Sequence, residues 1–322
     1  MYTLQDYGKM LADRVRMEAY LEALRRAVFP GCIVVDLGAG PGIFSLYACR
    51  WGARRVYAIE PGESIQLARE LAAANGFVDT IVAIEDYSSN LTLPERADVI
   101  ISDLRGVLPF FGRSIASIID ARDRLLANNG SLIPLRDILW AGIVSVPEFY
   151  RRKVEIWDQP GFDTSAARTK AVNTIFKIYP KIGDLLTAPA ELGDIDYPSV
   201  TTTRFAANPS WRTGRSGVAH GVCLWFATTL ADGVSFSNAP GLPETIYGAA
   251  FMPFSEPMPL ESGDRVSCEI KIDPCGEDYI WRWNTTFEIG SSGVLRAGFS
   301  QSTFYSTPVN PASLNAADVG TG

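Results

Sequence analysis

The sequence contains a single histidine, and it has few of the features that mark metal, disulfide or nucleophile chemistry. His220 alone cannot build a multi-histidine metal site, and a Ser-His-Asp triad would have only this residue to use. It lies in an alternating, strand-like stretch, so we expect an ordinary structural role for it. The five cysteines are odd in number and include no Cys-x-x-Cys pair. This pattern argues against a zinc site or a disulfide scaffold and favours a reducing compartment, the cytoplasm.

Long apolar runs and a basic stripe are also missing. No run approaches the roughly 18–20 apolar residues needed to cross a bilayer. Residues 1–10 are polar and lack the apolar core of a signal peptide. With 29 Lys and Arg against 36 Asp and Glu, the net charge is −7, unlike the basic surface of a nucleic-acid-binding protein. We therefore expect neither a membrane nor a nucleic acid as a partner.

The first part of the chain alternates between helical and strand-like segments. A helical stretch covers residues 7–28. Short apolar runs typical of buried strands then lie at 33–37, 56–59, 80–84 and 97–101, with helical segments at 43–51, 63–75 and 113–126. We expect the last helix to stop at the Asn-Asn-Gly sequence of residues 128–130. This alternation predicts an α/β fold, a Rossmann-like open parallel sheet with helices on both faces and a ligand beyond the carboxyl ends of its strands.

After Pro134 the pattern changes to short alternating segments rich in Trp, Phe, Thr and Val. Residues 135–146 and 218–305 predict an antiparallel β domain, a barrel or a sandwich. The resulting division is a cofactor-binding domain at 1–134 and a β-barrel-like domain at 135–306. A helical arm is inserted at about 148–190. The small polar tail at 307–322 is expected to be mobile.

A glycine loop follows the first strand directly. Residues 36–42 read Asp-Leu-Gly-Ala-Gly-Pro-Gly, so Gly38, Gly40 and Gly42 have a spacing one residue shorter than the dinucleotide fingerprint. Asp36 would repel a pyrophosphate and suits a cofactor with a cationic amino acid moiety. Glu60 ends the second strand, 18 residues after Gly42, where a carboxylate can accept from both hydroxyls of a ribose. The order of these signals indicates S-adenosyl-L-methionine rather than a tight turn followed by a solvated glutamate.

These motifs resemble the protein arginine methyltransferase family and its bacterial relatives from residue 7 to about residue 305. The spacing Tyr-x-x-Met-Leu-x-Asp-x-x-Arg-x-x-x-Tyr at residues 7–20 is similar to that family's cofactor-covering helices. The resemblance implies that Arg16 binds the cofactor carboxylate and that Met10 packs near the sulfonium. Ser88 and Ser89 occupy the stretch that brackets adenine, where the family's glutamate is missing. Further similar segments are residues 34–43, 52–60 and 121–126.

The family resemblance also implies a dimerisation arm in the β domain. The segment at 148–190 is rich in apolar side chains, more than an exposed insertion should leave in water. We therefore expect a two-fold homodimer.

The acceptor motifs depart from the family's pattern. The family holds its target guanidinium between two glutamates on the loop after the fourth strand. Here Asp103 stands at the first of these positions and Gly112 at the second. Arg105 and Arg113 have entered the same loop. Each side chain could face the acceptor pocket or point to water. The family's Thr-His-Trp loop reads Thr-Ile-Tyr at 245–247, without its histidine.

The sequence therefore predicts a methyltransferase with a rewritten acceptor site. We expect a small-molecule acceptor with an O, N or C nucleophile, neutral or anionic, aligned for in-line methyl transfer. Asp103 would orient or deprotonate it. Arg105 would share the pocket, and Tyr7 and Tyr247 are further candidates. Two alternatives stay open: a protein arginine N-methyltransferase that tolerates Asp103 and Gly112, and a catalytically inactive, cofactor-binding partner protein.

Overall fold

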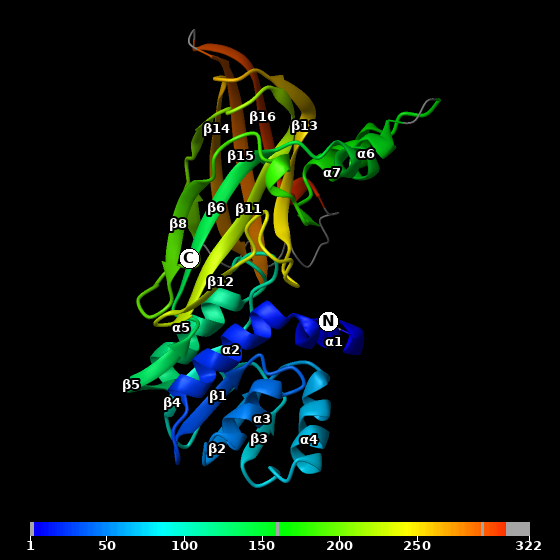
Figure 1. Cartoon of the computed structure of the whole chain (residues 1–322). Helices are drawn as coiled ribbons and strands as arrows, with labels where there is room; N and C mark the ends of the chain where they lie inside the picture. Colours follow the sequence, from blue (N-terminus) through cyan, green and yellow to red (C-terminus); the bar gives the residue numbers. More distant parts are fainter. Residues whose placement is uncertain (1–2, 159–160, 291–292, 307–322) are drawn as a thin grey trace, which may run out of the picture.

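The structure is a computed structural model that describes residues 3–158, 161–290 and 293–306. The tail at 307–322, expected to be mobile, lies outside these residues. Figure 1 shows a parallel-sheet domain below a long β domain, with helix α2 between them.

Five parallel strands form the first sheet, in the order β3-β2-β1-β4-β5. Every residue of β1 is buried, because helices cover both faces of the sheet. The strands are β1 (Ile33–Leu37), β2 (Arg55–Ile59), β3 (Ile81–Ile84), β4 (Ala97–Ser102) and β5 (Leu126–Ile133), and the connecting helices are α3 (Ile43–Arg50), α4 (Ser64–Ala74) and α5 (Ser114–Leu125). A short helical turn, η1 (Ser88–Asn90), follows β3. The structure confirms the Rossmann-like α/β fold.

The N-terminal helical stretch is two helices, α1 (Leu4–Ala12) and α2 (Arg14–Ala27), rather than one. Asp13 separates them with an extended backbone. One of its carboxylate oxygens accepts from the Arg16 N–H at 3.0 Å and the other from the Ile246 N–H at 2.7 Å. The break is thus an N-cap that is also bonded to the second domain.

The last helix of the first domain ends earlier than the sequence predicted. Helix α5 stops at Leu125, and residues 126–133 form strand β5. The Asn-Asn-Gly segment therefore lies within a strand. It falls in the exposed half of an edge strand, where such residues are tolerated better than in a central strand.

The second domain is built from two antiparallel sheets. One has the order β7-β13-β11-β6-β8, with β12 paired to β11, and the other has the order β10-β14-β15-β16, with β9 paired to β14. Phe254 and Phe287 pack edge to face between them, with ring centroids 5.0 Å apart. The strands are β6 (Arg136–Val144), β7 (Phe176–Ile178), β8 (Ala190–Asp196), β9 (Phe205–Ala207), β10 (Ser210–Arg212), β11 (Gly217–Ala231), β12 (Val234–Ser237), β13 (Ala249–Leu260), β14 (Arg265–Cys275), β15 (Asp278–Ile289) and β16 (Val294–Ser302). A turn, η4 (Thr303–Tyr305), follows β16.

The helical arm is shorter than expected. It consists of α6 (Pro147–Lys153), η2 (Glu155–Trp157) and α7 (Ser165–Val172), and projects sideways from the β domain (Figure 1). The chain after α7 returns to the sheet, because β7 pairs with β13. A further turn, η3 (Ile182–Asp184), precedes β8. His220 lies beneath the arm on β11, where its Nδ1 accepts from the Val146 N–H at 3.2 Å.

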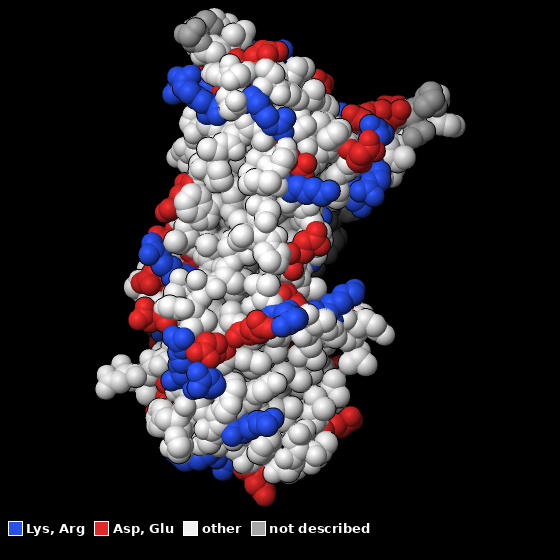
Figure 2. Space-filling view, in the orientation of Figure 1, with Lys and Arg blue, Asp and Glu red and all other residues white. Residues whose placement is uncertain are grey.

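Acidic and basic side chains are interspersed on the face seen in Figure 2, most visibly on the arm. Among the described residues, no helix is both long enough and apolar enough to cross a bilayer. All five cysteines are free thiols.

Candidate active site

A cavity of about 1380 Å³ lies between the two domains, at the carboxyl ends of the parallel strands. Its walls come from α1, the glycine loop, the loop after β4, and the edge of the β domain. Ten of the predicted site residues line it: Tyr7, Met10, Arg16, Gly38, Gly40, Glu60, Ser88, Asp103, Arg105 and Tyr247.

The glycine loop has a backbone that only glycine adopts easily. Gly38, Gly40 and Gly42 have φ values of +72°, +51° and +75°. A Cβ on Gly40 would lie 2.7 Å from the Tyr7 ring. The Tyr7 hydroxyl donates to Ser64 Oγ at 3.0 Å. Tyr7 therefore holds α1 across the glycine loop, at the wall of the cavity that this loop forms.

Glu60 faces the cavity from the end of β2. Its two carboxylate oxygens accept from the N–H groups of Gly40, at 3.1 Å, and Gly62, at 2.8 Å. A carboxylate has about four acceptor sites, so this one retains capacity for the hydroxyls of a ribose.

Asp36 supports the glycine loop from behind. Its carboxylate accepts from the Ser45 N–H at 3.0 Å and the Ser45 hydroxyl at 2.7 Å, at the start of α3. Burial raises the pKa of Asp36 to about 6. Asp36 belongs to a fully buried strand and is not among the residues that line the cavity, so its observed contacts support the loop and the start of α3. Ser89 also lies outside the cavity and is exposed, whereas its neighbour Ser88 is buried and lines it.

Arg16 and Asp103 form a buried ion pair in the cavity wall. Arg16 Nε lies 2.6 Å from Asp103 Oδ2, and another guanidinium nitrogen of Arg16 donates to the Met10 carbonyl at 3.2 Å. The Tyr247 hydroxyl donates to the same Asp103 oxygen at 2.7 Å, and the Tyr20 hydroxyl donates to Oδ1 at 3.1 Å. Asp103 thus has a fixed orientation at the carboxyl end of β4.

Opposing effects act on the ionisation of Asp103. Burial disfavours the charged carboxylate, but the guanidinium groups of Arg16 and Arg105 and the Tyr247 hydroxyl outweigh that effect. The pKa of Asp103 consequently lies below its ordinary value. Asp103 is therefore a carboxylate at neutral pH.

Arg105 lies beside Asp103, as expected, but its guanidinium turns toward the second domain. Its Nε is 3.8 Å from Asp103 Oδ1, and its Nη1 is 3.2 Å from Asp137 Oδ1 on β6. The guanidinium also lies over the ring of Phe226, 5.0 Å from the centroid. Asp137 is completely buried and accepts from the Tyr197 hydroxyl at 2.7 Å. The expectation that Arg105 makes the acceptor pocket cationic is therefore not supported, because a carboxylate from the β domain neutralises it.

Two carboxylates that line the cavity near Gly112 escaped the sequence analysis. Glu277 and Asp278 lie at the turn between β14 and β15 and line the cavity. Asp278 Oδ1 accepts from the Gly112 N–H at 3.2 Å, and Glu277 lies 3.8 Å from Arg113. Gly112 has a left-handed φ of +50°, a conformation in which a glutamate would be strained.

Aromatic rings form the wall beside this turn. Phe110 packs edge to face on Tyr279 and Trp281, with centroids 5.6 and 6.0 Å apart. No local motif marks these contacts in the sequence, because Phe110 lies in the first domain and its partners in the second.

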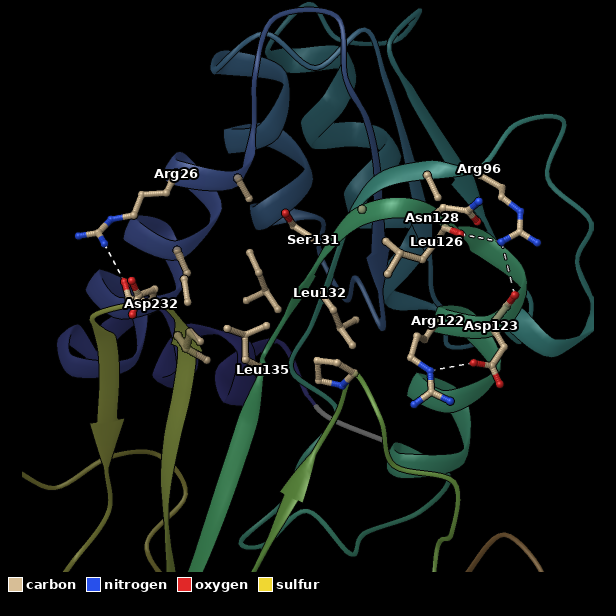
Figure 3. A pocket seen from close by; sticks show the side chains of 18 residues that line it. Arg26, Arg96, Arg122, Asp123, Leu126, Asn128, Ser131, Leu132, Leu135 and Asp232 are labelled. Atoms are coloured by element: carbon tan, nitrogen blue, oxygen red, sulfur yellow. Dashed lines mark hydrogen bonds and ion pairs between the residues drawn. The ribbon is translucent and has the colours of Figure 1, made fainter.

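A second cavity, of about 770 Å³, lies where α2, α5 and β5 meet the β domain. Figure 3 shows its apolar floor and the arginines at its rim. Arg26 donates to the Asp232 carbonyl at 2.9 Å, and Arg122 pairs with Asp123 at 2.7 Å. None of the predicted site residues lines this cavity, so the larger one is the candidate active site.

Two family models match the chain in succession. Residues 18–134 match the ribosomal protein L11 methyltransferase (PrmA), and residues 137–288 match the arginine methyltransferase oligomerization subdomain.

Curated relatives agree with these matches. The chain is 30% identical over 254 residues to a probable protein arginine N-methyltransferase 6 of Arabidopsis thaliana, covering 74% of this chain and 57% of the relative. It is 28% identical over 299 residues to protein arginine N-methyltransferase 2 of Homo sapiens, covering 87% and 68%. The chain thus spans 57% of the length of the first relative and 68% of the length of the second.

Solved structures share the fold. Protein arginine methyltransferase 10 of Arabidopsis thaliana superposes with a TM-score of 0.80 at 22% identity, covering 93% of this chain and 97% of that one. The Trypanosoma brucei PRMT1 enzyme-prozyme complex with AdoHcy gives a TM-score of 0.81 at 22% identity, covering 92% and 96%.

The family matches and the curated relatives place this parallel sheet, with its glycine loop and strand-end glutamate, among the S-adenosylmethionine-dependent methyltransferases. More narrowly, the chain belongs to the arginine methyltransferase-like family. The cofactor of this class is S-adenosylmethionine. The residues present fit that cofactor, because Gly38 and Gly40 line the cavity without side chains and Glu60 retains acceptor capacity.

Proposed function

We propose that this chain transfers a methyl group from S-adenosylmethionine to a guanidinium nitrogen of arginine in a protein. The observation that carries the proposal is Asp103, a buried carboxylate held at the end of β4 in the cavity wall. A carboxylate in this position can accept charge-assisted hydrogen bonds from a guanidinium and so align its nitrogen. The names of the curated relatives support the same acceptor.

The cofactor would be held along one half of the cavity. Arg16 would bind its carboxylate, Glu60 would bind its ribose, and Tyr7 and Met10 would cover it from α1; all four line the cavity. The bound cofactor supplies an electrophilic methyl group on a sulfonium. Every other requirement, chiefly alignment and the exclusion of water, falls to the protein.

A cationic acceptor replaces the small neutral or anionic molecule expected from the sequence. That expectation depended on the carboxylate missing at Gly112 and on Arg105 facing the acceptor, whereas Arg105 is paired with Asp137. The two additional carboxylates, Glu277 and Asp278, also favour a cation at the acceptor end. In this proposal Asp278, bonded to Gly112, compensates for the glutamate that the loop lacks.

Substitutions at the two ends of the acceptor site test the proposal. With an arginine-rich peptide, Asp103→Asn should lower kcat by about a hundredfold or more, because the acceptor loses its orienting carboxylate. Asp278→Asn should lower kcat/KM by roughly two- to fivefold, the range of an exposed ion pair. The matched control is Glu256→Gln, an exposed carboxylate on β13 that does not line the cavity. Unchanged arginine methylation in Asp103→Asn would sink the proposal.

A catalytically inactive, cofactor-binding partner protein is the second candidate. Gly112 favours it, because the loop after β4 then keeps only one of the family's two carboxylates. Tight binding of S-adenosylmethionine without transfer to any acceptor would select this candidate.

We further propose that the arm forms a homodimer contact. Ile156, Trp157 and Phe162 on the arm are 51%, 42% and 83% exposed, an apolar surface typical of an interface. The match of the β domain to an oligomerization subdomain supports this assembly. Five free thiols support a reducing compartment such as the cytoplasm.

A further inference from the structure

Four buried charges of alternating sign cross the boundary between the two domains. Arg16 pairs with Asp103 at 2.6 Å, Asp103 with Arg105 at 3.8 Å, and Arg105 with Asp137 at 3.2 Å. All four side chains are at most 8% exposed. Two cations and two anions leave the row formally neutral, and its last member comes from β6 of the β domain.

Arg105 is the only member of the row that contacts both carboxylates. Its side chain is 2% exposed, and Phe226 lies against its guanidinium. A guanidinium in such surroundings needs a counter-charge, because isolated buried charges are strongly disfavoured. Asp137 provides that counter-charge, and the Tyr197 hydroxyl fixes the other oxygen of Asp137.

We infer that Asp137 is a positioning residue for methyl transfer, which acts across the domain boundary by holding Arg105 against Asp103. The inference rests on the proposed function, in which Asp103 contacts the acceptor. Without Asp137, Arg105 would have one buried counter-ion in place of two and would be free to turn into the cavity. Without both Arg105 and Asp137, Asp103 would lose one of its two neighbouring cations.

The groups that face Asp103 come from every element packed against it. Arg16 and Tyr20 approach from α2, Tyr247 from the loop before β13, and Arg105 from its own loop. Only Arg105 is in turn held by a charge of the other domain. A change at Asp137 therefore reaches Asp103 through Arg105.

The test compares two paired substitutions. Arg105→Met/Asp137→Asn removes the pair together, and it should fold, because deleting both partners of a buried pair is far less costly than deleting one. The matched control is Arg136→Met/Asp194→Asn, which removes an exposed pair of the same two residue types, 2.8 Å apart, that joins β6 to β8. The titration of Asp103 is followed by carboxyl ¹³C NMR, with the signal assigned by its loss in Asp103→Asn.

The midpoint for Asp103 should rise by about one pH unit or more in Arg105→Met/Asp137→Asn, since a cation near 4 Å favours the carboxylate by at least that much. The midpoint should not change in the control. The acid limb of kcat for methyl transfer should move up with it, because transfer is lost as Asp103 is protonated. If the Arg105–Asp137 pair had only a structural role, the folded double variant would show the same Asp103 midpoint as the wild type.

An unchanged Asp103 midpoint in the folded double variant would overturn the inference. The NMR titration does not depend on turnover, so it tests the inference even if the wild-type protein methylates no arginine. In that case the proposed function fails, while a raised midpoint still supports the coupling of the Arg105–Asp137 pair to Asp103.

Discussion

Replacing Asp36 by Asn separates support of the glycine loop from direct contact with the cofactor. Asp36 is fully buried, and burial raises its pKa from 3.8 to about 6. The folded protein therefore holds a proton between these two pH values that the unfolded chain releases. The stability contributed by that proton is complete below pH 3.8 and is lost as the pH rises through about 6.

The size of the effect follows from this shift. Over the full range, a shift of about two units corresponds to about 3 kcal/mol. Between pH 5 and pH 7.5, linkage gives a loss of about 1.4 kcal/mol for the wild type that a neutral side chain does not suffer. Asparagine stays neutral, and its amide oxygen can still accept both hydrogen bonds from Ser45.

Urea unfolding at pH 5, 6 and 7.5 measures the difference. The free energy of unfolding of Asp36→Asn, relative to wild type, should increase by about 1.4 kcal/mol from pH 5 to pH 7.5. Affinity for S-adenosylmethionine should change by less than about 1 kcal/mol, because Asp36 does not line the cavity. A difference that is flat with pH refutes the buried-carboxylate reasoning. A loss of roughly 1.5–3 kcal/mol in cofactor binding would instead indicate that Asp36 contacts the cofactor directly.

Three further outcomes are expected. Glu60→Ala should weaken binding of S-adenosylmethionine by about 1–3 kcal/mol, the cost of unpaired ribose hydroxyls. In calorimetry the exposed Glu63→Ala is its control, and equal affinity of the two variants would remove Glu60 from the site. Gly40→Ala should lower Tm, because a left-handed φ costs alanine about 1–2 kcal/mol and the new Cβ would clash with the Tyr7 ring. An unchanged Tm would contradict that contact. Trp157→Asp on the arm should shift light scattering from dimer to monomer at micromolar concentration, whereas Leu295→Asp, on an exposed part of β16, should not; a wild-type monomer would contradict the interface.

The elements that follow local patterns could be predicted from the sequence. Strand β1 is a continuous apolar run followed directly by glycines, so its position and the loop after it are encoded within ten residues. Glu60 could be placed for the same reason, at the end of the next such run. The break between α1 and α2 was missed, although Asp13 is a residue type that commonly begins a helix.

The acceptor end could not be predicted in this way, because its contacts join distant parts of the chain. Asp278 reaches Gly112 from 166 positions away, and Asp137 reaches Arg105 from the other domain. The loop after β4, taken alone, suggested an arginine in the acceptor pocket beside Asp103 and a missing carboxylate. The β domain supplies a counter-ion for the first and a nearby carboxylate for the second.

The most direct test of the proposed activity is incubation of the full chain with S-adenosylmethionine and an arginine-rich protein, followed by mass spectrometry. The account predicts methylated arginine in the wild-type reaction and its loss in Asp103→Asn, with cofactor binding retained in both. Methyl transfer to a small molecule but to no arginine, or tight cofactor binding without any transfer, would contradict it.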